Sequence, residues 1–278
     1  MKVAVITGAA SGIGLALSLV CLQRDMAVVM VDKDSVKLDN EATRLTAQYP
    51  DQILCVPCDV TKPLEIEELL VAVDKKLGRV DWIFNNAGII GNLAPVWDLK
   101  PEHIHQVMDV NLYGMIHMIR VFMPYLIKQD NPAHIINMAS LYALCSGSQM
   151  AAYSMSKHAV LALSESLHFD IQRMGHRVDV SVVFPSFTDT SLLSKPSEVD
   201  ATFQNTLNSL LAHSRPAEDV ALHVVQEVEH KKFYILPDKE VKGYCEDRTK
   251  AILLQENPHV NSIEKLMGSL MKRKRRAS

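Results

Sequence analysis

The first fourteen residues constrain the fold most, because they join a buried strand to a helix through a glycine-rich turn. Residues 3–7, VAVIT, form a continuous apolar run, as in strands that a parallel sheet buries on both faces. Gly8, Gly12 and Gly14 follow, and the pattern of residues 15–20 then indicates a helix. Glycines permit positive φ angles, and a helix N-terminus attracts anions. The segment predicts a phosphate-binding turn, with an ordinary glycine-rich turn as the alternative.

A second apolar run favours the first of these interpretations. Residues 27–31 read as another strand, which ends at Asp32, eighteen residues past Gly14. A carboxylate at this place can accept a hydrogen bond from the ribose 2′-hydroxyl of a dinucleotide. The order strand, turn, helix, strand and Asp32 therefore predicts a dinucleotide-binding unit.

Strand-like segments continue to alternate with helical patterns along the chain. They lie at residues 53–56, 82–85, 134–138 and 180–184. This alternation predicts an α/β fold, a single Rossmann-type doubly wound parallel sheet with helices on both faces. A chain of 278 residues with 48% hydrophobic content can bury one large core of this kind. We expect the domain to span residues 1–237 and a C-terminal helical extension to span residues 238–278.

Tyr153 and Lys157 form the next informative feature, since residues four apart share one face of a helix. A neighbouring ammonium favours the phenolate and lowers the phenol pKa from about 10 toward the working pH. Ser140 lies thirteen residues upstream, just past a predicted strand. A bare Tyr-x-x-x-Lys pair is common on helix surfaces, so its meaning depends on the other motifs of the chain.

Those motifs occur in one order and at one set of spacings. They are Thr7-Gly8-x-x-x-Gly12-x-Gly14, Asp59-Val60, Asn85-Asn86-Ala87-Gly88, Asn111, Ser140 and Tyr153-x-x-x-Lys157. In this combination the chain resembles the classical short-chain dehydrogenase/reductase family over roughly residues 1–190. Several independent motifs at family spacing are far less probable by chance than any one of them.

The resemblance implies four catalytic residues. Tyr153 would be the general acid in ketone reduction and the general base in alcohol oxidation, and Lys157 would lower its pKa and hold the nicotinamide ribose. Ser140 would hydrogen-bond the substrate oxygen and stabilise its developing negative charge. Asn111 would bind a water that links Lys157 to solvent, and would interrupt a long helix.

The resemblance also implies a cofactor site along the strand ends. Its residues would be Gly8, Ser11, Gly12, Ile13, Gly14, Asp32, Lys33, Asp59, Val60, Asn86, Ala87, Gly88, Tyr153, Lys157, Pro185, Thr188 and Thr190. Asp59 and Val60 would flank the adenine ring, and the backbone at Thr188 would contact the nicotinamide carboxamide.

One part of this site departs from the family pattern. Where relatives continue Pro-Gly, this chain has Pro185-Ser186, and Thr188 takes the place of an aliphatic residue. The departure bears on the loop shape and the substrate preference rather than on the chemistry.

The choice of cofactor depends on two adjacent residues. Asp32 would accept hydrogen bonds from an unphosphorylated ribose and would repel a 2′-phosphate. Ser11 in the turn is neutral, whereas Lys33 follows Asp32 and could favour a phosphate. Because the carboxylate would be in direct contact, we expect NAD, with NADP as the alternative.

Residues 191–214 are expected to form a substrate lid. Its apolar residues are Leu192, Leu193, Phe203, Leu207, Leu210 and Leu211, and Ile89, Leu141, Tyr142 and Leu144 would line the other side. A lipophilic secondary alcohol or ketone fits such a site. Packing of the same leucines onto the body of the domain is an equal alternative.

No metal site is predicted, because the histidines and the five cysteines lack ligand spacing and Cys55 and Cys58 would point to opposite faces of a strand. No apolar run approaches the roughly 18–20 residues of a membrane span. The first strand begins at residue 3, which leaves no room for a signal peptide, so we expect a cytoplasmic protein.

The C-terminus predicts a short amphipathic helix. Asn261 and Glu264 are spaced as a capping box, and residues 263, 266, 267, 270 and 271 are apolar at helical spacing. Five cations follow at 272–276, while the rest of the chain carries 24 basic against 32 acidic residues. Such a tail could bind anionic lipid or nucleic acid. We favour a docked helix with a solvated end, and expect no nucleic acid partner.

The sequence thus predicts an NAD-dependent oxidoreductase that interconverts a lipophilic secondary alcohol and a ketone. An NADP-dependent ketoreductase is one alternative, and a non-catalytic dinucleotide sensor on the same fold is another. The resemblance also implies a homodimer or homotetramer, and the apolar stretches 115–126 and 159–167 suit either a subunit contact or the core.

Overall fold

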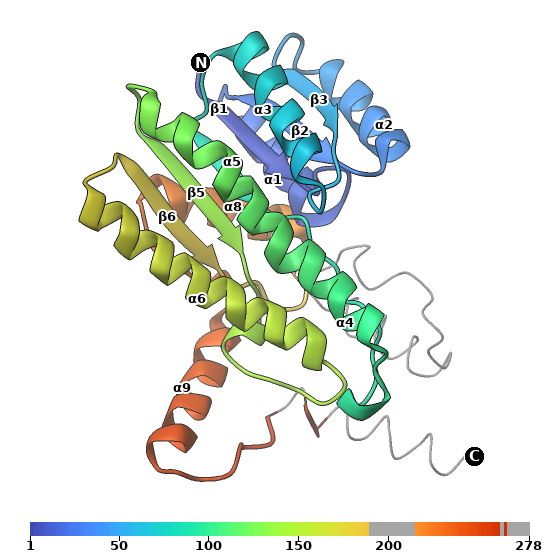
Figure 1. Cartoon of the computed structure of the whole chain (residues 1–278), viewed down its shortest axis with the longest axis vertical. Helices are drawn as coiled ribbons and strands as arrows, with labels where there is room; N and C mark the ends of the chain where they lie inside the picture. The colour runs from blue at the N-terminus through green and yellow to red at the C-terminus, as the bar shows by residue number, and fades with distance from the viewer. Residues whose placement is uncertain (189–214, 262–263, 266–278) are drawn as a thin grey trace.

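The computed structural model describes residues 1–188, 215–261 and 264–265, and its centre is a seven-stranded parallel sheet (Figure 1). The strands are β1 (Val3–Thr7), β2 (Ala27–Asp32), β3 (Ile53–Pro57), β4 (Trp82–Asn85), β5 (Ala133–Met138), β6 (Val178–Val183) and β7 (Tyr234–Ile235). They lie in the order β3-β2-β1-β4-β5-β6-β7, and every neighbouring pair is parallel. The predicted Rossmann-type fold is confirmed.

Helices cover both faces of this sheet. They are α1 (Gly12–Leu22), α2 (Ser35–Thr46), α3 (Pro63–Leu77), α4 (Pro101–Met108), α5 (Gly114–Lys128), α6 (Ala151–Met174), α8 (Ala217–Glu229) and α9 (Lys239–Leu253), with short helical turns η1 (Val96–Asp98), η2 (Asp109–Tyr113) and η3 (Leu141–Ala143). Alternate residues of β1 serve opposite faces. Ala4 and Ile6 pack with α1, α2 and α8, whereas Val3 and Val5 pack with α3, α5 and the end of α6.

The last two strands differ in extent from the ranges that their apolar residues predict, 180–184 and 233–236. β6 begins at Val178 rather than residue 180, and β7 is reduced to Tyr234–Ile235. β7 is the edge strand, where only β6 offers hydrogen bonds, so pairing stops early. The helical extension is present as α9, and it buries Val241 in the same cluster as Tyr153. The division of the chain at residue 237 stays a prediction.

The expectation that no apolar segment is long enough to span a membrane is corrected at Pro101–Lys128. This segment runs through α4, η2 and α5, and its length and apolar composition would suffice to cross a membrane. We expected no such stretch, because polar residues such as Asn111 interrupt the apolar runs of this segment. The mean hydropathy over 18 consecutive residues of the segment is nevertheless high, since a few polar residues lower it only slightly. In the structure Met118, Phe122 and Leu126 are buried against the sheet, as in a core helix. The expected subunit contact on this helix stays a prediction.

A buried carboxylate, that of Asp81, joins the amino-terminal ends of β1 and β4. These ends lie opposite the carboxyl ends, where the sequence motifs are located. The backbone N–H of Val3 donates to Oδ2 of Asp81, at 2.8 Å. The guanidinium of Arg79 binds both carboxylate oxygens, Nε to Oδ2 at 2.9 Å and Nη2 to Oδ1 at 2.5 Å. Because Asp81 is almost fully buried, these partners replace the water that its charge loses on folding.

Asp81→Ala is expected to destabilise the fold by about 3–5 kcal/mol, since it leaves a guanidinium and a buried N–H without their acceptor. The urea midpoint of unfolding should fall accordingly. Asp247→Ala, at an exposed position of α9, serves as the matched control and should leave the midpoint unchanged. Equal midpoints for both variants would contradict the anchoring role of Asp81.

Candidate active site

The predicted site residues gather at one edge of the sheet, because the carboxyl ends of parallel strands all lie there (Figure 1). The glycine turn follows β1, Asp32 ends β2, Asp59 follows β3, Asn86 follows β4, Ser140 follows β5 and Pro185 follows β6. From β1 the chain adds β2 and β3 on one side of the sheet, and from β4 it adds β5, β6 and β7 on the other side. Doubly wound sheets bind their ligands in the crevice at such a reversal of strand order.

The glycine turn has the geometry that a bound phosphate needs. Gly8 and Gly12 have φ angles of 68° and 53°, which residues with a side chain rarely adopt. A Cβ on Gly14 would lie 2.1 Å from the carbonyl oxygen of Gly8, so only glycine lets α1 approach the turn. α1 begins at Gly12 with Ser11 as its N-cap residue, and Ile13 packs against the core. The positive end of the α1 dipole therefore lies at the turn.

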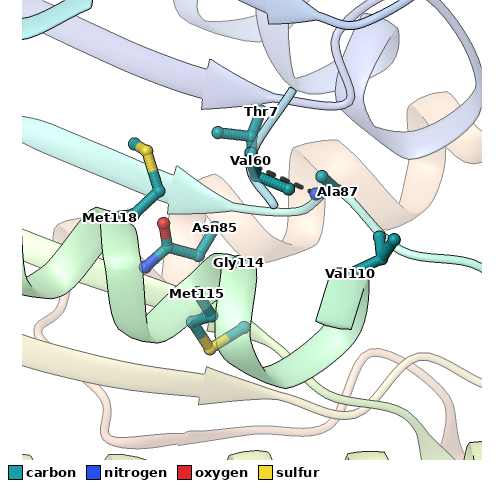
Figure 2. Close-up of a pocket in the computed structure, with 8 residues that line it drawn as sticks. All are labelled: Thr7, Val60, Asn85, Ala87, Val110, Gly114, Met115 and Met118. Carbon is teal, nitrogen blue, oxygen red and sulfur yellow. Dashed lines mark hydrogen bonds between the residues drawn. The ribbon is translucent and has the colours of Figure 1, made fainter. Parts of the chain in front are cut away.

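The segment after β4 supports this turn from behind. The hydroxyl oxygen of Thr7 accepts the backbone N–H groups of Asn86 and Ala87, at 2.9 and 3.0 Å; Figure 2 shows the bond to Ala87. The side-chain amide of Asn86 donates to the carbonyl of Thr7 at 2.9 Å. Asn86 and Ala87 thus hold the turn through hydrogen bonds.

A small cavity lies beside these residues, between the ends of β1 and β4 and the start of α5. Its lining is Thr7, Val60, Asn85, Ala87, Val110, Gly114, Met115 and Met118 (Figure 2). The cavity has a volume of about 10 Å³, roughly the space of one water molecule and far below the roughly 300 Å³ at which small-molecule pockets begin. Val60 is buried here, close to Gly114. A dinucleotide does not fit into this cavity, so its binding groups are those of the open carboxyl edge.

Asp32 lies against the glycine turn. Its Oδ2 accepts the backbone N–H of Ala10 at 3.2 Å, and its Oδ1 accepts that of Asp34 at 3.0 Å. The carboxylate is only half-buried, while the adjacent Lys33 is exposed. A carboxylate next to positive-φ glycines and a helix N-terminus fits a dinucleotide whose ribose lies at Asp32.

Asp59 is held by its own loop. Burial works against its charge, yet hydrogen bonds from the backbone N–H and hydroxyl of Thr61, with the charges of Lys33 and Lys62, lower its pKa. Both bonds from Thr61 go to Oδ1, at 3.0 and 2.8 Å. The contact of Asp59 with adenine stays a prediction.

Tyr153, Lys157 and Ser140 come together as the sequence predicts. Both α6 residues are buried, and Nζ of Lys157 lies 5.7 Å from the ring centroid of Tyr153. The ammonium donates to the carbonyl of Met138 at 2.8 Å, which directs it toward the end of β5. Ser140 hydrogen-bonds the phenol of Tyr153.

Asn111 completes this group, and the predicted break in the helix is confirmed. It lies in η2, a π-helical turn between α4 and α5. Its Oδ1 accepts the N–H of Ile89 at 2.8 Å, and its Nδ2 donates to the carbonyl of Ile89 at 2.9 Å and to Ser156 at 3.0 Å. A Cβ on Gly88 would lie 3.3 Å from Oδ1 of Asn111 and 3.6 Å from Nζ of Lys157. The water that Asn111 is expected to hold stays a prediction.

The pKa values of the pair differ from the expectation. Burial raises the pKa of Tyr153, and the hydrogen bond with Ser140 offsets this only in part. Burial also lowers the pKa of Lys157, to about 8. The sequence predicted a lowered pKa for Tyr153, because spacing places a cation nearby but does not reveal how far both groups leave water.

The loop after β6 closes the site. The carbonyl of Pro185 accepts the N–H of Leu141 at 2.9 Å, which joins the loop to η3. Thr188 is buried, and Ser186 donates its N–H to Asp238 at 2.8 Å. Asp238 was missed from the sequence, because its side chain does not cap α9 but bonds this loop, 52 residues away in the chain. Thr190 and the predicted lid at 191–214 lie outside the described residues.

The ring of Tyr153 belongs to a row of three aromatic side chains. Tyr142 contacts it edge to face, with centroids 5.9 Å apart, and Phe187 contacts Tyr142 in the same way at 6.4 Å. Tyr142 and Leu141 are buried. The predicted place of Leu141 and Tyr142 beside a lipophilic substrate stays a prediction.

Comparison with known proteins identifies the family. The model of the short chain dehydrogenase family matches residues 2–200. The chain belongs to the short-chain dehydrogenase family. This short-chain dehydrogenase is therefore an oxidoreductase, and α9 lies beyond the matched segment.

Two curated relatives and one solved structure are similar over most of this short-chain dehydrogenase. 1-Deoxy-11-beta-hydroxypentalenate dehydrogenase from Streptomyces exfoliatus is 36% identical over 248 residues, which cover 89% of this chain and 86% of the relative. CLA biosynthesis dehydrogenase/reductase from Lactiplantibacillus plantarum is 28% identical, covering 96% and 98%. The structure of a Burkholderia phymatum short chain dehydrogenase/reductase in complex with NAD has a TM-score of 0.87 and 30% identity, covering 93% and 96%.

Lys157→Met is expected to abolish turnover while raising the stability of this dehydrogenase at pH 7. Burial of the ammonium lowers its pKa from 10.5 to about 8, a penalty of about 3 kcal/mol. The lost hydrogen bond to Met138 costs about 1 kcal/mol. A net gain of about 2 kcal/mol corresponds to a Tm roughly 4–8 °C higher.

The sign of this effect is checked by pH. The penalty is complete below the folded pKa of about 8 and fades as the pH rises toward the unfolded value of 10.5. The melting temperatures of wild type and variant should therefore converge between these pH values. A lower Tm for the variant at pH 7 would show that burial of Lys157 does not destabilise the fold.

Proposed function

We propose that this protein is an NAD-dependent dehydrogenase that interconverts a lipophilic secondary alcohol and its ketone. The observation that carries the proposal is the buried group of Tyr153, Ser140 and Lys157 at the carboxyl edge of the sheet, with Asn111 behind it. The phenol of Tyr153, the hydroxyl of Ser140 and the ammonium of Lys157 suit a reaction in which a substrate oxygen gains or loses a proton.

In alcohol oxidation the phenol oxygen of Tyr153 takes the hydroxyl proton, and in ketone reduction it returns one. NAD, held by residues that include Asp32 and Lys157, would supply the acceptor for the hydride of the alcohol carbon. The hydroxyl of Ser140 donates a hydrogen bond to the substrate oxygen, where negative charge develops. Lys157, with a pKa of about 8, is mostly charged at pH 7 and stabilises that charge in the dry site.

Burial adjusts the acid to this task. The raised pKa of Tyr153 keeps its phenol protonated at neutral pH, which is the form that ketone reduction requires. Oxidation requires the phenolate, which the ammonium of Lys157 and the cationic nicotinamide ring would favour. The protonation state of the phenol therefore depends on the charge next to Tyr153.

The position of Asp32 supports NAD over NADP. Its carboxylate faces the turn through Ala10, where a ribose 2′-phosphate would meet a negative charge, whereas Lys33 is exposed. The Burkholderia phymatum relative has been solved in complex with NAD. The apolar lining by Tyr142 and Phe187 supports a lipophilic substrate, and the name of the Streptomyces relative describes dehydrogenation of a hydroxy compound.

Tyr153→Phe is expected to lower kcat by about 10²–10⁴-fold, because it removes only the acid and base oxygen. The Kd of NADH should stay within about threefold of the wild type, as no charge is lost. Turnover of a panel of secondary alcohols is followed by NADH absorbance. Cofactor binding in both proteins with turnover in neither would instead support a non-catalytic dinucleotide sensor.

Asp32→Ala is expected to reduce the preference for NADH over NADPH by about tenfold, or about 1.4 kcal/mol. The reason is that the repulsion of the 2′-phosphate is lost. The two Kd values are measured by fluorescence titration, with Lys33→Ala as the matched control on the neighbouring residue. Tighter NADPH binding by the wild type would show that Lys33 determines the cofactor, and would favour an NADP-dependent ketoreductase.

A further inference from the structure

The C-terminal extension contacts the active site at its beginning. Asp238, the residue before α9, accepts the backbone N–H of Ser186 through Oδ2 at 2.8 Å. Its Oδ1 lies 3.7 Å from the guanidinium of Arg215. The carboxylate is buried, with 7% of its residue exposed, so both contacts are needed to offset the loss of water. One end of the extension is therefore fixed to the loop that follows β6.

The extension contacts the site again at its far end. Glu264 accepts the backbone N–H of Ser148 through Oε2 at 2.8 Å. Asn261 caps this turn, since its Oδ1 accepts the N–H of Glu264 at 2.8 Å, which confirms the predicted cap. A reciprocal capping box would return the Glu264 carboxylate to Asn261. In this structure the carboxylate bonds the loop at Ser148 instead.

Ser148 belongs to the segment that joins Ser140 to Tyr153. Glu264 approaches this segment closely, because a Cβ on Gly147 would lie 3.5 Å from Oε2 and 3.3 Å from the ring of Tyr142. Tyr142 is the residue that contacts Tyr153 edge to face. Glu264 and the ring of Tyr142 therefore both lie beside Gly147.

The middle of the extension packs along the same side. Val241 of α9 is fully buried in the cluster that contains Tyr142 and Tyr153, and Tyr244 packs against it. Figure 1 shows α9 beyond the arrowheads of β5 and β6, at the edge where the active site lies. The extension thus contacts this side of the molecule at its start, through Asp238 and Val241, and again at Glu264.

From these contacts we infer that the C-terminal extension forms a wall of the substrate site, and that Glu264 is a positioning residue for the loop carrying Tyr142. The substrate part of this inference rests on the proposed alcohol oxidation. A carboxylate that bonds the N–H of Ser148 would hold the loop at one distance from Tyr153, and would thereby set the space available to a substrate beside Tyr142. The family match ends at residue 200, so Glu264 lies beyond the matched segment.

The contact itself is tested by amide hydrogen exchange on the full-length protein. Glu264→Ala should speed exchange of the Ser148 N–H by about tenfold, the effect of losing a hydrogen bond to a charged group. Glu264→Gln should keep exchange near the wild-type rate, because its amide oxygen still accepts. Glu256→Ala is the control within the same extension, where the carboxylate pairs with His259. Unchanged exchange in Glu264→Ala, or equal exchange in the control, overturns the inference.

The consequence for the substrate is tested by kinetics with 2-decanol and NAD. Glu264→Ala should raise the KM for 2-decanol by about tenfold, with kcat and the Kd of NADH within about twofold, and Glu264→Gln should restore the wild-type KM. An unchanged KM, or a parallel loss of kcat and NADH binding, overturns the inference. Absence of alcohol turnover in the wild type counts against the proposed function, and the exchange rates at Ser148 still decide the contact.

Discussion

The parallel pairing of all seven strands is the constraint on which the rest of the molecule depends. Parallel strands need long crossovers, which become helices on both faces, and all of their carboxyl ends then meet at one edge. Residues as distant in the chain as Gly8, Asn86, Ser140 and Pro185 become neighbours for this reason. The buried strands supply rigidity, and the loops at their ends supply the chemistry.

The active site places polar groups where an apolar core would be more stable. Asn111 satisfies its side chain through Ile89 and Ser156 and so tolerates full burial. Lys157 has its bond to Met138, yet its pKa still falls to about 8, which marks an incompletely compensated charge. Such residual cost is typical of sites built for function rather than for stability.

The features that could be predicted from sequence are those that short segments specify. Local spacing identifies the glycine turn, Asp32 and the Tyr153–Lys157 pair, and it places each motif after a particular strand. The structure brings these features together at the carboxyl edge of the sheet. The roles of Asp238 and Glu264 could not be predicted, because their partners lie 52 and 116 residues away in the chain. The pKa of Tyr153 also required the structure, since burial is a property of the assembled core and outweighs the hydrogen bond with Ser140.

The π-helical turn at Asp109–Tyr113 has a consequence for how this family member can vary. A π turn holds one residue more than an α turn, so it sets the rotational phase between α4 and α5. Deleting a single residue there would turn α5 by about 100° about its axis. Met118, Phe122 and Leu126 would then leave the sheet together. The number of residues in this turn is thus as restricted as the identity of residue Asn111. Exposed loops, by contrast, tolerate insertions and deletions.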